Sequence, residues 1–291
     1  MGDSATSSTA QQARIDALMA EASSEAVLRR VLQFIALFLL VALIVVTYRE
    51  TEFAPGQLFD GIHNMGRVLA GFLHPDWSLM KPGGAGFPEG LVPHYALQTL
   101  AIAILGTALG AVVAIPLSFV AAGNLMRRNA LGSAVYFVVR TLMSMIRAIP
   151  TIFWGILFVT SVGLGPFPGV LAVMIFSVGL MSKLFSEAIE AIDSGQVEAL
   201  TATGANPIQV LVNGVGPQVL PYLVAHLLYS FEVNVHSATI LGLIGAGGIG
   251  FLFSQYIEQF LYRQEAMVLI VVVLMTMLID YTSATIRRRI I

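Results

Sequence analysis

Long apolar runs alternate with polar segments along the chain, and six of the runs are long enough to cross a lipid bilayer. A membrane-spanning α-helix needs about 20 mainly apolar residues, or slightly fewer where flanking side chains reach back to the headgroups. The runs predict six transmembrane helices, over residues 31–47, 95–121, 133–162, 169–188, 217–244 and 266–286. The pattern therefore predicts an all-α polytopic membrane protein.

The polar segments divide the chain into predicted parts: residues 1–30, a first transmembrane helix (31–47), an outer segment (48–94), a helical core (95–286) and a tail (287–291). The first part suits either a disordered tail or an amphipathic helix on the membrane, through Ile15, Leu18, Met19 and Ala22. A signal peptide has its apolar run nearer the start, so we expect an uncleaved first helix. In the outer segment, residues 58–72 suit a short interfacial helix or packing over the spans.

Composition excludes several classes of protein. Apolar residues make up 57% of the 291 residues and charged residues 11%, against about 25% charged in a soluble domain. Water cannot solvate so much apolar surface, so a lipid bilayer is the expected solvent. The net charge is −2 and there is no long Lys/Arg run, so the chain lacks the basic surface that binds the phosphates of a nucleic acid. The absence of Cys excludes disulfides, thiolate metal sites and cysteine nucleophiles.

The positions of Lys and Arg set the expected orientation, because basic residues are retained in short cytoplasmic segments. With a cytoplasmic N-terminus, eight of the 15 lie inside: Arg14, Arg29, Arg30, Arg127, Arg128, Arg287, Arg288 and Arg289. Four lie outside (Arg49, Arg67, Lys81, Arg263), and three lie within apolar runs (Arg140, Arg147, Lys183). We therefore expect both termini in the cytoplasm, which the even number of spans also favours.

A polar elbow over residues 190–216 is expected on the cytoplasmic side, between the fourth and fifth spans. Asp193 and Gln196 resemble a capping box, in which two side chains satisfy free N–H groups at a helix start. They predict a short helix up to Thr203. Gly204 suits the left-handed position just after its end.

The same local signals then repeat. Asn206 is a good N-cap and Pro207 suits the first helical position, where its missing N–H has no cost. These residues predict a second short helix to about Asn213. Gly216 and Pro217 are expected to begin the fifth span in the same way.

The elbow contains Glu198-Ala199-Leu200, then Gly204, then Pro217 thirteen residues after that glycine. This spacing resembles the EAA loop of ATP-binding-cassette (ABC) importer permeases. Three positions depart from the family pattern: Leu200 replaces an Ala, while Gly214 and Gly216 replace apolar residues.

The resemblance implies that the elbow is the coupling helix that docks into a cleft on an ATPase. The implied coupling residues are Glu198, Ala199, Leu200, Gly204 and Ala205.

Further segments are similar to the phosphonate/phosphite importer permeases. They begin Arg147-Ala-Ile-Pro150, Lys183-Leu-Phe-Ser and Phe231-Glu232-Val-Asn234, the last continuing to Gly250. The resemblance implies a type I ABC importer fold, with a five-helix core plus an N-terminal helix, in the bacterial cytoplasmic membrane. It also implies a homodimer, two ATPase subunits that bind ATP and Mg, and an external phosphonate-type binding protein. His236 departs from the Arg that is common in the family.

A glycine motif has the residue order of the dinucleotide-binding pattern G-x-G-x-x-G but not its structural context: Gly245-Ala-Gly247-Gly248-Ile-Gly250. A dinucleotide loop follows a strand, whereas this one follows a membrane helix. Close packing explains these glycines, and a hinge or gate at the outer mouth is the alternative. The chain has no P-loop, and its His, Asp and Glu have no metal-site or paired-carboxylate spacing. We therefore expect no catalytic residue, metal or cofactor in this chain, and an ATPase in a partner.

Charges within the spans point to a pathway, because each costs about 2.5 to 3.5 kcal/mol at the centre of a membrane helix. Arg140 and Arg147 are seven residues apart and share a helix face, where their guanidinium groups suit phosphonate oxygens. The alternative places Arg140 at the membrane interface and pairs Arg147 with Glu232. Lys183 and Glu187 suit an intrahelical ion pair.

The fifth span carries polar residues on two faces, so it is expected inside a bundle. Asn234, His236 and Ser237 are the predicted pathway residues. Glu232 is expected to pair with an Arg and hold the bundle together. His236 also suits a satisfied interior histidine.

The sequence therefore predicts a permease that imports phosphonate, phosphite or a related phosphorus oxyanion by alternating access, with ATP hydrolysed by another subunit. One alternative keeps the architecture and carries another small solute such as methionine. The other is a passive channel or a membrane enzyme.

Overall fold

The computed structural model describes residues 29, 31–51, 55–83, 86–127 and 129–290, which fall into two compact units, residues 1–65 and 66–291. In the first unit, Val31–Glu50 is a helix that is apolar and long enough to span a membrane. None of its residues is buried within the chain. The amphipathic helix or tail expected within residues 1–28 lies outside the described residues.

The elements that follow are helical throughout the described part of the chain. They are α2 (Pro55–Phe72), the 3-10 helix η1 (Trp77–Met80), α3 (Leu91–Val120), α4 (Gly123–Met126), α5 (Ala130–Ala148), α6 (Thr151–Val162), α7 (Pro166–Glu190), α8 (Ser194–Ala202), α9 (Pro207–Val210), the π-helical turn η3 (Leu211–Val215), α10 (Gly216–Gly242), α11 (Ile249–Glu258) and α12 (Tyr262–Ile290). The helix expected over residues 58–72 is confirmed as α2.

Six candidate membrane spans are present among the described residues, as the hydrophobic pattern predicts. They are Val31–Glu50, Leu91–Val120, Ala130–Ala148, Pro166–Glu190, Ile208–Gly242 and Tyr262–Ile290.

The third predicted span, residues 133–162, is wrong as a single helix. The chain leaves α5 at Ile149, which has an extended conformation (ψ of 117°), and α6 starts after Pro150. Proline clashes with a helical conformation of the residue before it. Pro150 therefore excludes Ile149 from α5, and the helix ends at Ala148. Only α5 remains long enough to span, because α6 has 12 residues.

The second elbow helix does not end near Asn213. Its start is as predicted: Oδ1 of Asn206 accepts a 2.9 Å hydrogen bond from the Gln209 N–H, and Oε1 of Gln209 accepts one from the Asn206 N–H. The helix then continues through η3 into α10, giving one helical stretch of 35 residues over Ile208–Gly242. In a π-turn the backbone hydrogen bonds join residues five apart instead of four. This change of pattern suits the start of α10, because the nitrogen of Pro217 has no hydrogen to donate.

The core forms where α3, α7 and α10 meet. A Cβ on Gly106 would lie 2.5 Å from Val173, and one on Gly110 would lie 2.5 Å from Ser177, so these glycines let α3 approach α7 closely. The main buried cluster is Ile102, Ala103, Ala172, Val173, Val235, Ala238, Leu241 and Ala246.

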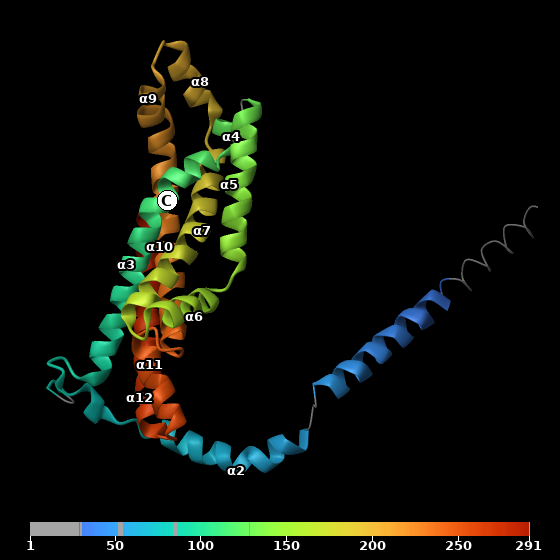
Figure 1. Ribbon diagram of the computed structural model, residues 1–291, viewed down its shortest axis with the longest axis vertical. Coiled ribbons are helices and arrows are strands. Elements are labelled where there is room, and N and C mark those ends of the chain that lie inside the picture. The colour runs from blue at the N-terminus through green and yellow to red at the C-terminus, as the bar shows by residue number, and fades with distance from the viewer. Residues whose placement is uncertain (1–28, 30, 52–54, 84–85, 128, 291) are drawn as a thin grey trace, which may run out of the picture. The chain divides into compact units, whose positions relative to one another are not determined.

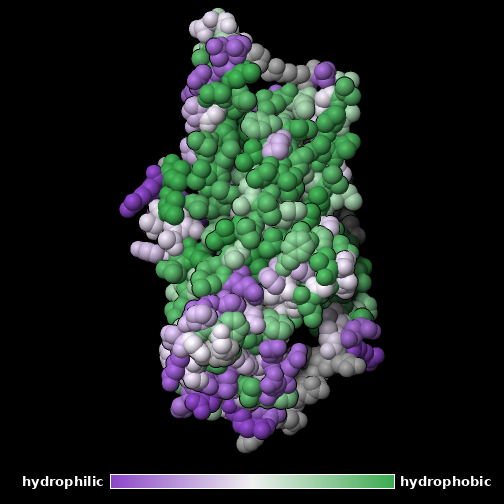
Figure 2. Space-filling view, turned by 60° about the vertical axis from the view of Figure 1, so that its left-hand side comes forward, coloured by the Kyte–Doolittle hydropathy of each residue, from purple (hydrophilic) through white to green (hydrophobic). Residues whose placement is uncertain are grey.

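Within the second unit, α8 and α9 lie at one end of the long helices and α11 lies toward the other (Figure 1). Hydrophobic side chains cover the middle of the face in Figure 2, and hydrophilic ones gather at both ends, most extensively at the end away from α8. This separation fits helices that cross a bilayer with polar segments on both sides.

Candidate functional site

The elbow starts with α8, whose capping is partly as predicted. Oδ1 of Asp193 accepts a 2.9 Å hydrogen bond from the Gly195 N–H and so caps the helix. Gln196 is not the reciprocal partner: the Asp193 N–H donates to Oε1 of Gln218, 2.9 Å away on α10. Gly204 has a φ of +80°, which confirms the left-handed position after the helix. The elbow is therefore fixed to α10 at its base.

Two departures from the EAA pattern compensate each other. A Cβ on Gly214 would lie 2.9 Å from Cδ1 of Leu200, so the larger side chain at 200 occupies space that the smaller residue at 214 leaves. Glu198 and Ala199 are exposed on α8, and Ala205 is half-buried. No local sequence pattern predicts this compensation, because it depends on how α8 folds back onto η3.

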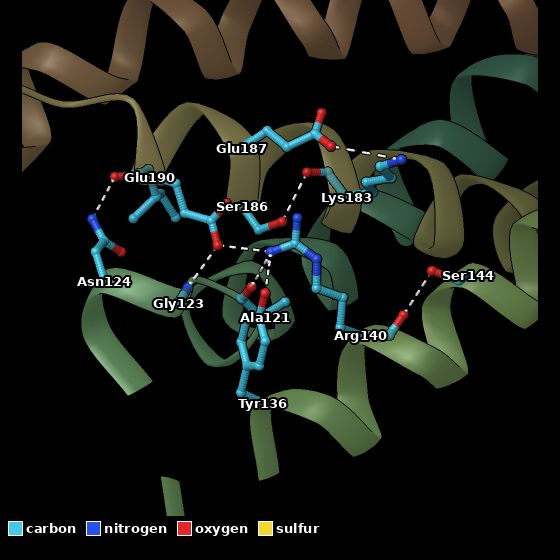
Figure 3. A network of polar contacts seen from close by, with 11 residues as sticks. Ala121, Gly123, Asn124, Tyr136, Arg140, Ser144, Lys183, Ser186, Glu187 and Glu190 are labelled. Carbon is cyan, nitrogen blue, oxygen red and sulfur yellow. Dashed lines mark hydrogen bonds and ion pairs between the residues drawn. The ribbon is translucent and has the colours of Figure 1, made fainter. Parts of the chain in front are cut away.

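A polar network joins the last turn of α7 to α5 and to the turn after α3 (Figure 3). Oε1 of Glu190 accepts hydrogen bonds of 2.7 Å from Nη1 of Arg140 and from the Gly123 N–H. The same Arg140 nitrogen donates to the Tyr136 hydroxyl at 2.9 Å and to the Ala121 carbonyl at 3.4 Å. Sequence reasoning missed the pairing of Arg140 with Glu190, since the two residues lie 50 positions apart.

A polar stripe runs along α5 through Arg140, Ser144 and Arg147. Their spacing of four and three residues places them on one face of the helix. A groove of about 530 Å³ beside the stripe is lined by Tyr136, Phe137, Arg140, Thr141, Ser144, Met145 and Ala148. Arg147 is exposed, and no acid among the described residues lies within ion-pair distance of it. Its guanidinium group is available to an anion.

Glu232 pairs with an Arg, as expected, but the partner is Arg287 of α12, at 3.0 Å. The pairing with Arg147 considered as an alternative is wrong. The intrahelical pair of Lys183 with Glu187 is confirmed at 3.6 Å.

The three predicted pathway residues of α10 point in different directions. Asn234 is fully buried, and its Nδ2 donates 2.7 Å hydrogen bonds to the hydroxyls of Thr107 on α3 and Ser177 on α7. His236 is exposed, with Nδ1 2.9 Å from the Glu232 carbonyl oxygen, and Ser237 is half-buried. Within one chain, Asn234 therefore belongs to the packed core rather than to an open surface.

The glycine motif forms a tight turn between α10 and α11. Gly245, Gly247 and Gly248 all have a φ near +80°. A Cβ on Gly247 would lie 2.8 Å from Pro166, and one on Gly248 would lie 2.6 Å from Oγ1 of Thr99. This geometry supports close packing. It also ties the turn to α3 and to the start of α7.

A clamp holds the segment before η1 against the start of α12. The Asp76 N–H donates to the Arg263 carbonyl, and Nε of Arg263 donates to the His74 carbonyl, both at 3.0 Å. The Ser78 hydroxyl and the Ser78 N–H both donate to Oδ1 of Asp76. These two bonds, the hydroxyl's above all, lower the pKa of the Asp76 carboxyl from its ordinary value of 3.8. These polar residues thus hold two distant parts of the sequence together.

Comparison with known proteins identifies the family. Residues 114–290 match the family described as binding-protein-dependent transport system inner membrane component. The chain belongs to this family. It is the permease subunit of an ABC importer and a multi-pass membrane protein. The match contains α4 to α12, and with them the elbow and the polar stripe.

Two relatives of the permease come from Stutzerimonas stutzeri. One is the phosphite transport system permease protein PtxC, 37% identical over 231 residues that cover 79% of each chain. The other is the putative phosphite transport system permease protein HtxC, 32% identical over 94% of the permease and 93% of that protein.

Among solved structures, a chain of the MetNI methionine ABC transporter in inward-facing conformations superposes with a TM-score of 0.61. It is 23% identical, and the match covers 69% of the permease and 96% of that chain. This likeness confirms the type I importer fold expected from the elbow.

Proposed function

We propose that the permease imports phosphite, phosphonate or a related phosphorus oxyanion. Relatives that match most of the chain are named as phosphite transport permeases, which supports this class of substrate. The observation that carries the proposal within the chain is the exposed Arg147 guanidinium, which has no acidic partner among the described residues. A guanidinium group donates two parallel hydrogen bonds to oxygens of such an anion.

The proposed pathway follows α5. Arg147 binds the oxyanion directly, and Arg140, whose charge is balanced by Glu190, lines the groove two helical turns away. His236 and Ser237 on α10 contribute polar contacts to the same route, whereas Asn234 maintains the packing behind it. Arg147 attracts the anion into the membrane, and the polar groups along the groove keep it from being held in one rigid site.

The proposed cycle is alternating access in a homodimer with two ATPase subunits and an external binding protein. The ATPase subunits bind ATP and Mg, and their closure moves α8 through Glu198, Ala199, Leu200, Gly204 and Ala205. The spans then rotate and open outward to receive substrate from the binding protein. Hydrolysis of ATP resets them. In this arrangement α8, α9 and both termini face the cytoplasm of the bacterium, and Gly245, Gly247 and Gly248 lie near the outer mouth, where they hinge or gate the pathway.

Replacement of Arg147 tests the pathway. In vesicles that contain the permease, its ATPase and its binding protein, Arg147→Gln is expected to lower phosphite uptake at subsaturating substrate about tenfold or more, because a hydrogen bond to a charged group contributes about 1.5 to 3 kcal/mol. Arg147→Lys keeps the charge and is expected to retain part of the uptake. Arg288→Gln is the matched control, since Arg288 is exposed at the end of α12.

Equal uptake by Arg147→Gln and Arg288→Gln would refute the pathway. The substrate class is tested separately by identifying the ligand that co-purifies with the binding protein. Methionine or a metal ion as that ligand would refute the phosphorus oxyanion. Uptake that persists without ATP would instead favour a passive channel.

A further inference from the structure

α5 carries the proposed anion-binding arginine and buries few of its own side chains. The structure describes all 19 of its residues, and only Tyr136 and Met143 are buried within the chain. At its far end, the helix stops at Ile149 and the chain turns through Pro150 into α6. α5 also packs closely on α7 near this end, where a Cβ on Gly179 would lie 2.9 Å from Ile146. Polar contacts hold the half of the helix that contains Arg140.

The ion pair between α5 and α7 ends on a carboxylate oxygen that also accepts from the turn after α3. Oε1 of Glu190 accepts from Arg140 and from the Gly123 N–H, both at 2.7 Å (Figure 3). The Asn124 side chain donates to the Ile189 carbonyl at 2.9 Å, which fixes the same turn of α7 a second time. Charge-assisted hydrogen bonds of this length are the stronger kind, and they fix direction as well as distance.

The joint has no spare room on the α4 side. A Cβ on Gly123 would lie 3.2 Å from Oε1 of Glu190 and 3.4 Å from Tyr136, so the backbone itself fits against the acid and the aromatic ring. The Arg140 guanidinium carbon lies 5.3 Å from the centroid of the Tyr136 ring, within cation–π range. One of the two buried side chains of α5 therefore belongs to the joint.

Glu190 is also the residue that connects this joint to the elbow. It is the last residue of α7, and Asp193, three residues later, caps α8. The short link between them includes no glycine or proline that would let it bend independently. In the other direction, Arg147 lies seven residues beyond Arg140 on one continuous helix, about 10 Å along its axis.

We propose that the Arg140–Glu190 pair is the joint that transmits movement of α8 to α5 and so to Arg147. The two residues are positioning residues, and the inference rests on the proposed coupling function. When α8 moves, the last turn of α7 moves with it. The ion pair then carries the Arg140 half of α5 along, and the rest of the helix, including Arg147, moves with it.

Coupled uptake tests the joint. In vesicles with the ATPase and the binding protein, supplied with inorganic phosphite, Arg140→Gln and Glu190→Gln are each expected to lower uptake per ATP hydrolysed about tenfold, within the usual range of coupling between sites. The double variant is expected to lose no more than either single variant, because the residues act as a unit. Arg140→Lys keeps the charge and is expected to retain more uptake than Arg140→Gln.

The matched control is the second ion pair of α7. Lys183→Gln breaks a pair whose side chains are similarly exposed, and it is expected to change uptake by less than about twofold. Uptake per ATP that is unchanged in Arg140→Gln, or that falls equally in Lys183→Gln, would overturn the joint. Losses that multiply in the double variant would overturn it too. If Arg140→Gln fails to assemble, Glu190→Gln replaces it, because its amide oxygen still accepts the Gly123 N–H.

A distance measurement tests the joint even if phosphite is not the substrate. The chain has no Cys, so Thr201→Cys on α8 and Leu131→Cys on α5, both exposed, place spin labels at two positions. With the joint intact, the distance between the labels is expected to stay narrow and unchanged when ATP binds to the complex. Adding Arg140→Gln is expected to broaden it, and Lys183→Gln is not.

A distance that shifts on ATP binding in the otherwise unaltered chain would refute the joint, as would a distance that Arg140→Gln leaves narrow. Failure of the unaltered complex to take up phosphite would refute only the proposed substrate.

Discussion

Replacing Asn234 tests how the bundle is held together. Asn234 is fully buried, and its amide nitrogen donates 2.7 Å hydrogen bonds to Thr107 and Ser177, so one side chain joins α10 to α3 and α7. Asn234→Ala removes both bonds and leaves a small cavity among three helices. The variant is therefore expected to weaken the bundle without touching the proposed pathway.

The expected loss follows from these contacts. Hydrogen bonds between membrane helices contribute on average about 0.6 kcal/mol each, so the two bonds account for about 1.2 kcal/mol. The missing amide group leaves a cavity of about 25 Å³, which adds about 0.6 kcal/mol at about 24 cal/mol per Å³. Together these effects predict a decrease of about 2 kcal/mol in the free energy of unfolding.

The assay is reversible unfolding of the purified permease in mixed micelles, followed by loss of helical circular dichroism. Asn213→Ala is the matched control: Asn213 is exposed, and its Nδ2 donates to the Gln209 carbonyl at 3.0 Å. This control is expected to change stability by less than about 0.5 kcal/mol. Thr107→Val, combined with Asn234→Ala, is expected to show a coupling energy of about 0.6 kcal/mol. Equal losses in Asn234→Ala and Asn213→Ala would refute the reasoning.

Two further predictions concern the two ends of the molecule. Gly204→Val forces a branched side chain into a φ of +80° and is expected to destabilise the end of α8 by about 1 to 2 kcal/mol and to reduce uptake. Gly204→Asn is expected to retain most of the uptake, because Asn tolerates this conformation. Equal uptake by both variants in the vesicle assay would argue against a role for the turn. Because the pKa of Asp76 is lowered, its hydrogen bonds stabilise the clamp above pH 3.8 and are lost as pH falls through the lower pKa of the folded state. Trp77 fluorescence should report this loosening, and a transition that persists unchanged in Asp76→Asn would assign it to another group.

Much of the fold could be predicted because its signals are local. Apolar runs give the spans, since a helix buries its own backbone polar groups wherever lipid surrounds it. Asp193 and Asn206 cap their helices through N–H groups two or three residues away, and Gly204 needs only its own backbone conformation. Pro150 also carried a local signal, but the apolar run on both sides of it suggested one span where the structure has two helices.

Propensity, capping and motif spacing act over a few residues, so the amino-acid order alone predicted most of the helices, the elbow and the family. Only the tertiary structure decided which side chains meet. It paired Arg140 with Glu190 and Glu232 with Arg287, placed Asn234 in the core, and left Arg147 exposed. The physical reason is that a charged residue in a span needs a partner, but the sequence does not say which helix faces pack together and so which partner is within reach.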